Sequence, residues 1–233
     1  MALPVGAVVG APLALAFWHL DAAAWPFVAG SSLLEVAYFV LLSAAYRHGE
    51  LSVVYPLARG LAPVFVLVGT ITSATGHQIA GVLLVAAGVL LVRGFHPGRG
   101  TGFGVAIACC IASYTVVDKH GVGHASPLAY LELISVFMSV AYLGGFLATR
   151  GPAAVRAAIG WRPVVAGVAT FAAYALVLRA LTLAPAAPVA AVRETSVLFG
   201  AALGWLVLKE RATRWRIAGV VLVTAGVVLV SLS

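Results

Sequence analysis

Four charged side chains lie deep inside apolar stretches of this sequence: Glu35, Arg59, Arg193 and Glu194. An ionisable group near the centre of a bilayer is costly, so each of them needs a partner or a function. At a rise of about 1.5 Å per residue, Glu35 lies roughly 16 Å along its expected helix, and Arg59 roughly 12 Å along the next. Such charges could line a cavity for a polar solute or a proton, or they could form ion pairs that only hold helices together. Adjacent helix positions point about 100° apart, so only one of Arg193 and Glu194 is expected to face a cavity well.

Tyrosines accompany these charges at helical spacing. Tyr38 follows Glu35 by three residues and Tyr55 precedes Arg59 by four, so each pair shares one face of a helix. Tyr174 occupies the place equivalent to Tyr38 in a second, related part of the chain. The predicted substrate-binding residues are therefore Glu35, Tyr38, Tyr55, Arg59, Tyr174, Arg193 and Glu194.

Other polar residues are weaker candidates. Asp118 and Lys119 close an expected helix, and we predict that both are solvated. Asp118, His120 and His124 are three potential metal ligands, but no further ligand supports their loop, so we expect no metal site. Packing or membrane-interface positions are predicted for Tyr114, Tyr130 and Tyr142. The sequence contains no HExxH or GxSxG motif, so we expect neither an enzyme nor a cofactor.

The composition is that of a chain solvated by lipid. Hydrophobic residues make up 63% of it and charged residues 9%, whereas about 25% of a soluble domain is charged. At about 20 residues per crossing, the 233 residues accommodate roughly nine or ten spans and no separate soluble domain. The net charge of +7 has no folded basic face to present it, so nucleic acid is not expected as a partner. The expected partners are the bilayer and a small-molecule substrate.

Hydropathy and helix breakers predict nine transmembrane helices. They lie at 2–19, 24–46, 51–73, 77–93, 102–118, 127–148, 163–183, 187–208 and 215–232. Pro56 and Pro63 fall inside the third helix, and each removes a backbone hydrogen bond. They predict a bend beside Arg59 that opens onto a cavity, or else a kink that serves packing alone. The longest connection is predicted around 149–162.

Basic residues sort by loop. One side of the predicted topology carries Arg47, Arg93, Arg99, Arg150, Arg156, Arg162, Lys209, Arg211, Arg214 and Arg216. The opposite side carries only Lys119. Because cytoplasmic loops are enriched in Lys and Arg, the first set is predicted to be cytoplasmic. The chain would then be integral to the cell (inner or plasma) membrane, with its N-terminus in the cytoplasm and its C-terminus outside.

Internal similarity predicts two related halves. The segment AGVLLVAAGVLLV at 80–92 recurs as AGVVLVTAGVVLV at 218–230, and Trp25, Val28, Ala37 and Tyr38 recur 136 residues later. The displacement moves each helix five places along, an odd number, so equivalent helices should run in opposite directions. We expect an inverted repeat of residues 1–93 and 102–233, joined by a linker at 94–101. Inverted repeats are typical of transporters that work by alternating access.

Three passages carry a family resemblance: AAYRHGELSVVYPLARGLAPVFVLVG at 44–69, the two repeated segments, and LAPAAPVAAVRETSVLFGAALGWLVLKERATRWRIAG at 183–219. The chain resembles the EamA-type family of the drug/metabolite transporter superfamily. The resemblance implies ten helices in two five-helix inverted repeats, and transport, often export, of small metabolites. This chain has no counterpart of the family's first helix. It also reads TSATGHQ at 72–78, where the family has Gly-Glu, so only Glu210 keeps that acid.

The sequence thus predicts an all-α integral membrane protein that carries small polar or amphipathic metabolites by alternating access, and not an enzyme. Glu35 could couple transport to protons, and facilitated diffusion fits equally well. A non-transporting membrane subunit, or a truncated paralogue that assembles with a partner chain, is the alternative that the missing helix suggests. The repeated glycine-rich helices are expected to act as scaffold or as a homodimer contact.

Overall fold

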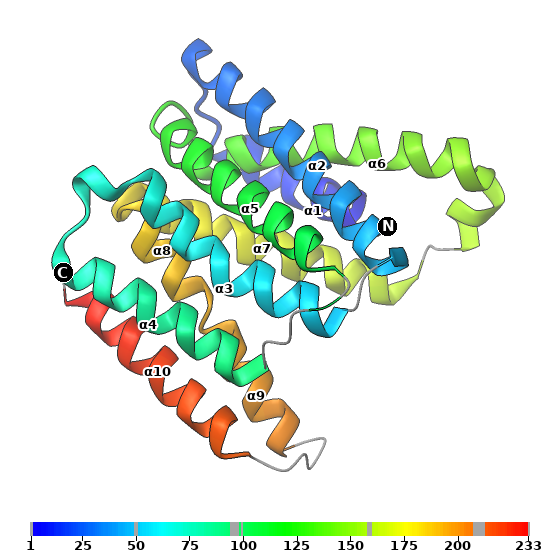
Figure 1. Cartoon of the computed structure of the whole chain (residues 1–233). Helices are drawn as coiled ribbons and strands as arrows, with labels where there is room; N and C mark the ends of the chain where they lie inside the picture. The colour runs from blue at the N-terminus through cyan, green and yellow to red at the C-terminus, as the bar shows by residue number, and fades with distance from the viewer. Residues whose placement is uncertain are drawn as a thin grey trace. The chain divides into compact units, whose positions relative to one another are not determined.

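The computed structural model describes residues 2–48, 51–93, 98, 100–157, 160–206 and 213–232. Within them the chain forms ten α-helices and two short 3₁₀ turns (Figure 1). The α-helices are α1 (Ala2–Ala16), α2 (Trp25–His48), α3 (Leu51–Gly69), α4 (Gly76–Arg93), α5 (Thr101–Gly121), α6 (Pro127–Ala157), α7 (Trp161–Leu183), α8 (Ala186–Arg193), α9 (Ser196–Leu206) and α10 (Arg214–Ser231). The 3₁₀ turns are η1 (Ala22–Ala24) and η2 (Ile71–Ser73).

The predicted all-α class is confirmed. Five helical segments of the described chain are long and apolar enough to cross a membrane: Ala22–Arg47, Thr101–Gly121, Pro127–Arg156, Trp161–Leu183 and Arg214–Ser231. Helix α1 and most of α3 and α4 are apolar but shorter. In lipid a helix satisfies its own backbone hydrogen bonds, which is why apolar stretches of this length fold in this way. With α8 and α9 taken as one interrupted span, the described helices correspond to the nine predicted spans.

The helix predicted at 127–148 is longer than expected. It continues as α6 to Ala157, so much of the connection predicted around 149–162 is helical. Gly151 lies in the left-handed region (φ 73°) and Pro152 follows it, which marks a kink. Glycine adopts this conformation at no steric cost, and proline cannot donate the helical hydrogen bond. These two residues therefore bend the helix, and the chain continues as helix beyond them.

The helix predicted at 187–208 is not continuous. The amides of Glu194 and Thr195 donate to the carbonyls of Ala191 and Val192, each at 3.0 Å. These bonds span three residues, as in a 3₁₀ turn, and they separate α8 from α9. A 3₁₀ stretch within a helix often marks a hinge or local strain. The interruption falls on one of the charges that the sequence placed inside the membrane.

The described chain forms two compact units. The first unit comprises Met1–Val36 and Val117–Leu183, and the second comprises Ala37–Val116 and Ala184–Ser233. Each unit thus combines segments from both predicted halves of the sequence. Helices α2 and α5 contribute to both units.

Close approach of α1 to α7 organises the first unit. A Cβ atom added to Gly6 would lie 3.1 Å from the carbonyl oxygen of Gly167. A Cβ on Gly10 would collide with the ring of Phe171. Small residues let membrane helices approach closely, where lipid supplies no hydrophobic driving force. Helix α1 also packs against α6.

Helices α4 and α10 form the most extensive contact of the second unit and lie side by side in Figure 1. Gly81 packs against Gly226, and Gly88 packs against Gly219. A Cβ on Gly219 would lie 2.6 Å from the carbonyl oxygen of Gly88, and one on Gly88 would lie 2.7 Å from that of Gly219. Under the sequence repeat, Gly81 corresponds to Gly219 and Gly88 to Gly226, so each contact repeats the other. This reciprocity is expected of equivalent, antiparallel helices related by a local twofold axis.

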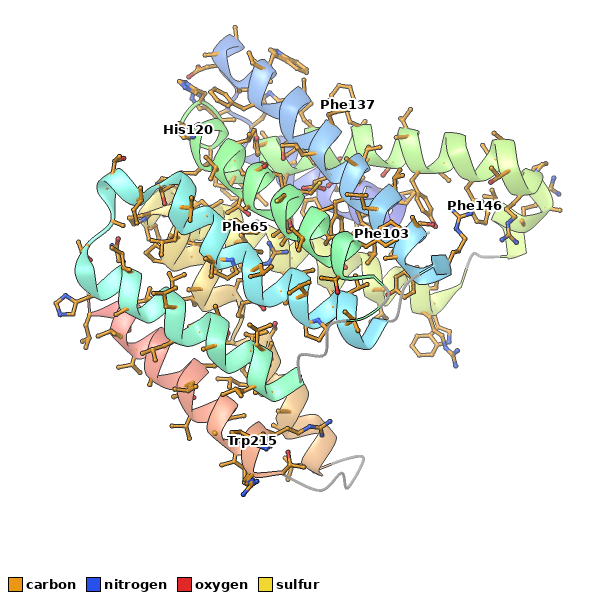
Figure 2. The ribbon with its side chains drawn as sticks, in the orientation of Figure 1. Phe65, Phe103, His120, Phe137, Phe146 and Trp215 are labelled. Atoms are coloured by element: carbon orange, nitrogen blue, oxygen red, sulfur yellow. The ribbon has the colours of Figure 1, made fainter. Side chains whose placement is uncertain are left out.

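A small apolar core joins α2, α3 and α5 in the second unit. Its buried members are Ala45, Val54, Ala58 and Ile107. The rings of Tyr38 and Phe103, the latter labelled in Figure 2, pack against it. Because Ala58 precedes Arg59 directly, burial of Ala58 restricts the rotation of α3 and thereby the direction in which Arg59 projects.

Candidate functional site

An ion pair within the second unit joins α3 to the end of α8. The Nη1 atom of Arg59 donates to Oε1 of Glu194 at 3.0 Å. The Glu194 side chain is only 4% exposed, whereas the Arg59 side chain is 26% exposed. The carboxylate is therefore enclosed, and the guanidinium retains an accessible side. Removing one partner of such a buried pair strands the other charge, which typically costs about 3–5 kcal/mol.

Both partners lie where the helical backbone is irregular. Helix α8 ends at Arg193, and Glu194 lies in the tight turn that follows it. On α3, Pro63 lies inside the helix and cannot donate to the carbonyl oxygen of Arg59, four residues earlier. The proline and the turn thus leave polar backbone groups outside the regular helical hydrogen bonding, close to the charged side chains. In lipid such backbone groups are tolerated only against protein or a water-lined cavity.

Arg193 also has a partner. Its Nη1 atom donates to the hydroxyl of Tyr114 at 3.4 Å, and Tyr114 is buried. The expectation that only one of Arg193 and Glu194 faces a cavity assumed a regular helix. The helix is interrupted at this point, and both side chains reach partners within the second unit.

Tyr38 extends this group. Its ring meets that of Tyr114 edge to face, with 6.4 Å between centroids. The charges of Arg59 and Arg193 both act on the Tyr38 hydroxyl. Tyr114 was predicted to be a packing or interface residue; it is buried, and it also contacts two of the predicted site residues. No sequence spacing could reveal this, since Tyr114 and Arg193 are 79 residues apart.

Tyr55 lies beside Arg59, as the four-residue spacing predicts. The guanidinium carbon of Arg59 is 5.7 Å from the centroid of the Tyr55 ring, within the range of a cation–π contact. Tyr55 is 38% exposed. The exposed ring and the accessible side of the guanidinium form one amphipathic surface.

Tyr174 belongs to a different group, in the first unit. Its hydroxyl donates to Oδ2 of Asp118 at 2.5 Å, and the hydroxyl of Tyr130 donates to Oδ1 at 3.0 Å. Asp118 is 0% exposed, so the prediction that it is solvated is wrong. Helix α5 runs on to Gly121, past the predicted end at residue 118, and buries Asp118 against α6 and α7.

Lys119, also predicted to be solvated, is partly exposed and makes one contact with α7. Its Nζ atom donates to the carbonyl oxygen of Leu181 at 2.6 Å, so this ammonium is bound near the end of α7. Glu35, on the first-unit part of α2, acts electrostatically on Tyr130. Within the first unit, Glu35 and Tyr174 are thus the two predicted site residues that the structure describes.

The histidines of the α5–α6 connection stack on an aromatic ring. The rings of His120 and His124 lie 6.1 Å and 5.7 Å from that of Phe27. Within the described part of the chain, no group of three or more His, Cys, Asp or Glu side chains could hold a metal ion. Glu210 and most of the linker at 94–101 lie outside the described residues.

Comparison with known proteins adds a family and a fold. A model described as the EamA-like transporter family matches residues 98–232, more than half of the chain. One solved structure, described only as the crystal structure of a protein, is similar with a TM-score of 0.74 and 16% sequence identity. That alignment covers 99% of this chain and 85% of the other. No curated protein matches.

Proposed function

The chain belongs to the EamA-like transporter family, and from this membership we propose that it is a secondary transporter working by alternating access. The family places it, as an integral membrane protein, in the drug/metabolite transporter superfamily. Small polar or amphipathic metabolites are the proposed substrates, and export is the proposed direction. The proposed contacts with the substrate are those within the second unit: Tyr38, Tyr55, Arg59, Arg193 and Glu194.

The observation that carries this proposal is the half-accessible ion pair of Arg59 and Glu194. Arginine presents five N–H donors in one plane, and the described bond to Glu194 uses Nη1. With 26% of the side chain exposed, other donors are available to an anionic or polar part of a solute. The exposed Tyr55 ring lies next to them and suits an apolar part.

The ion pair also compensates the charge of Arg59 when no substrate is bound. A transporter must return without substrate, and an uncompensated guanidinium inside the membrane would make that state costly. Glu194 neutralises Arg59 in the absence of solute. We infer that an arriving anionic group competes with or supplements this carboxylate, and that its departure restores the pair.

Irregular backbone near the site supports a change of conformation. The tight turn at Glu194 and Thr195 and the proline at position 63 are places where α8, α9 and α3 can bend at low cost. Broken helices beside the binding site are a recurring feature of secondary transporters. Glu35 is the proposed proton-coupling residue, and uncoupled diffusion is the alternative that experiment must separate.

The test is flux through the purified full-length chain in proteoliposomes. A panel of labelled amino acids, other carboxylates and amphipathic amines would be offered to wild type, Arg59→Ala and Arg179→Lys. We expect wild type and the Arg179→Lys control to move at least one solute class, and Arg59→Ala to lose that flux by roughly tenfold or more. Absence of flux for every class with folded wild type would overturn the transport function. Equal flux in Arg59→Ala would remove this site.

A further inference from the structure

A buried carboxylate in the first unit joins three helices and is used by none of the roles proposed so far. Both oxygens of Asp118, on α5, accept a tyrosine hydroxyl: Tyr130 donates from α6 and Tyr174 from α7. The side chain is fully buried. Hydrogen bonds to an ionised acceptor are roughly twice as strong as neutral ones. Two hydroxyl donors thus stabilise the ionised form of this buried carboxyl group.

The local sequence is shaped around this arrangement. Gly121 follows Asp118 by three residues, on the same face of α5. A Cβ on Gly121 would lie 2.6 Å from the hydroxyl oxygen of Tyr130 and would also collide with its ring. The absence of a side chain at position 121 thus lets Tyr130 reach the carboxylate.

A second contact fastens the same helix ends. Lys119 donates to the carbonyl oxygen of Leu181, and Leu181 lies seven residues after Tyr174, on the same face of α7. His120, labelled in Figure 2, marks this end of α5. Two consecutive residues of α5 therefore contact α7 at two points about two turns apart.

From this geometry we propose that Asp118 is a proton-binding site that locks the ends of α5, α6 and α7 while it is ionised. A proton from the aqueous phase adds to one carboxylate oxygen and forms an O–H bond there. That oxygen becomes a donor, so the tyrosine hydroxyl that donated to it must rotate and accept instead. No other covalent bond changes, and the two hydrogen bonds to a charged acceptor become weaker bonds between neutral groups. Protonation thereby weakens the junction, and deprotonation restores it.

Burial links the proton to the state of the junction. With Asp118 fully enclosed, a proton can enter or leave only when the helix ends separate. The titratable neighbours are Tyr130 and Tyr174, which donate to the carboxylate, and Lys119 and His120 on the same helix end. Glu35 of α2 acts on Tyr130. The oxygens of Asp118 already face two hydroxyl donors, an arrangement that suits exchange of a proton better than capture of a metal ion.

The place of this lock in a transport cycle rests on the proposed function, whereas proton binding does not. Its test is infrared spectroscopy of the full-length protein in lipid, titrated with acid. We expect acid to produce an absorption band of a protonated carboxyl group, and this band should be absent from Asp118→Asn. In Tyr174→Phe the pH at which the band reaches half its intensity should move by about one unit. Glu132→Gln removes another buried acid of the first unit and should leave the band in place. A spectrum unchanged by Asp118→Asn would overturn the proposal, as would a midpoint unchanged in Tyr174→Phe.

Hydrogen exchange tests the lock itself. The amides of Val122 and His124 are bonded to the carbonyls of Asp118 and Gly121, at 2.9 Å and 3.0 Å. We expect the protection of these amides, corrected for the intrinsic pH dependence of exchange, to be roughly ten- to a hundredfold lower in Asp118→Asn and in acidified wild type than in wild type at neutral pH. The control Tyr142→Phe should match wild type. Unchanged exchange in both Asp118→Asn and acidified wild type would refute the lock, whether or not the protein carries any solute.

Discussion

Arg59 and Glu194 are 135 residues apart in the sequence, and their side chains form a hydrogen-bonded ion pair of 3.0 Å. The pair joins α3 to the interruption between α8 and α9. It combines a buried carboxylate with a partly accessible guanidinium, and this asymmetry distinguishes it from a bridge that serves stability alone.

Replacing Glu194 should destabilise the protein. In Glu194→Ala the Arg59 guanidinium keeps its charge and loses its carboxylate, so we expect a loss of about 3 kcal/mol in the free energy of unfolding. The double variant Arg59→Met/Glu194→Met removes both charges and should recover most of that loss. Thermal unfolding in detergent measures both. A double variant no more stable than Glu194→Ala would contradict a mutual pair.

Substitution of the crossing glycines should separate α4 from α10. A Cβ on Gly219 would lie 2.6 Å from the Gly88 carbonyl oxygen, so Gly219→Ala should cost about 1–3 kcal/mol. Gly81→Ala should cost a similar amount, because the repeat makes these positions equivalent. Gly144→Ala is the matched control, since a Cβ there meets nothing within 4 Å. Unfolding curves in which all three variants lose the same stability would argue against close helix packing as the cause.

Removing the Tyr114 hydroxyl should weaken substrate binding. Arg193 donates to this hydroxyl at 3.4 Å, and loss of a long hydrogen bond to a charged group costs about 1 kcal/mol, or roughly fivefold in affinity. Tyr114→Phe is therefore expected to raise the concentration for half-maximal flux roughly fivefold. Tyr142→Phe alters a ring that stacks on Phe146 and should have no such effect. Identical flux curves for wild type and Tyr114→Phe would remove Tyr114 from the site.

Neutralising Glu35 tests its proposed proton coupling. A carboxyl group that carries a proton during the cycle cannot be replaced by an amide, so we expect Glu35→Gln to lose the dependence of flux on pH. Flux in proteoliposomes across a series of external pH values measures this. Full activity with the pH dependence of wild type would show that Glu35 takes no part in coupling.

The predicted topology places Arg47 and Arg214 on the cytoplasmic side. Single cysteines at these positions, in a background in which Cys109 and Cys110 are replaced, should both resist an impermeant thiol reagent in intact cells. Both should react in inverted membrane vesicles. Labelling of the two positions from different faces would overturn the inverted topology, and with it the alternating-access proposal.

Sequence reasoning succeeded mainly where the physical cause is local. Apolar length predicted the helices, because a helix in lipid satisfies its backbone within one segment. The four-residue spacing of Tyr55 and Arg59 predicted their contact, because that spacing is one helical turn. It failed at Asp118, where the helix end looked solvated. The donors that bury this carboxylate come from 12 and 56 residues away.

By itself, the sequence determined that the chain is a set of apolar helices, that two of them are near-copies, and that a few charges must lie within them. Only the tertiary structure decided which charges meet, that α8 and α9 are separate, and that Asp118 joins three helices. The reason is that hydropathy depends on each residue and its near neighbours. Pairing depends on how each helix is rotated about its axis and where it ends, and packing against distant segments sets both.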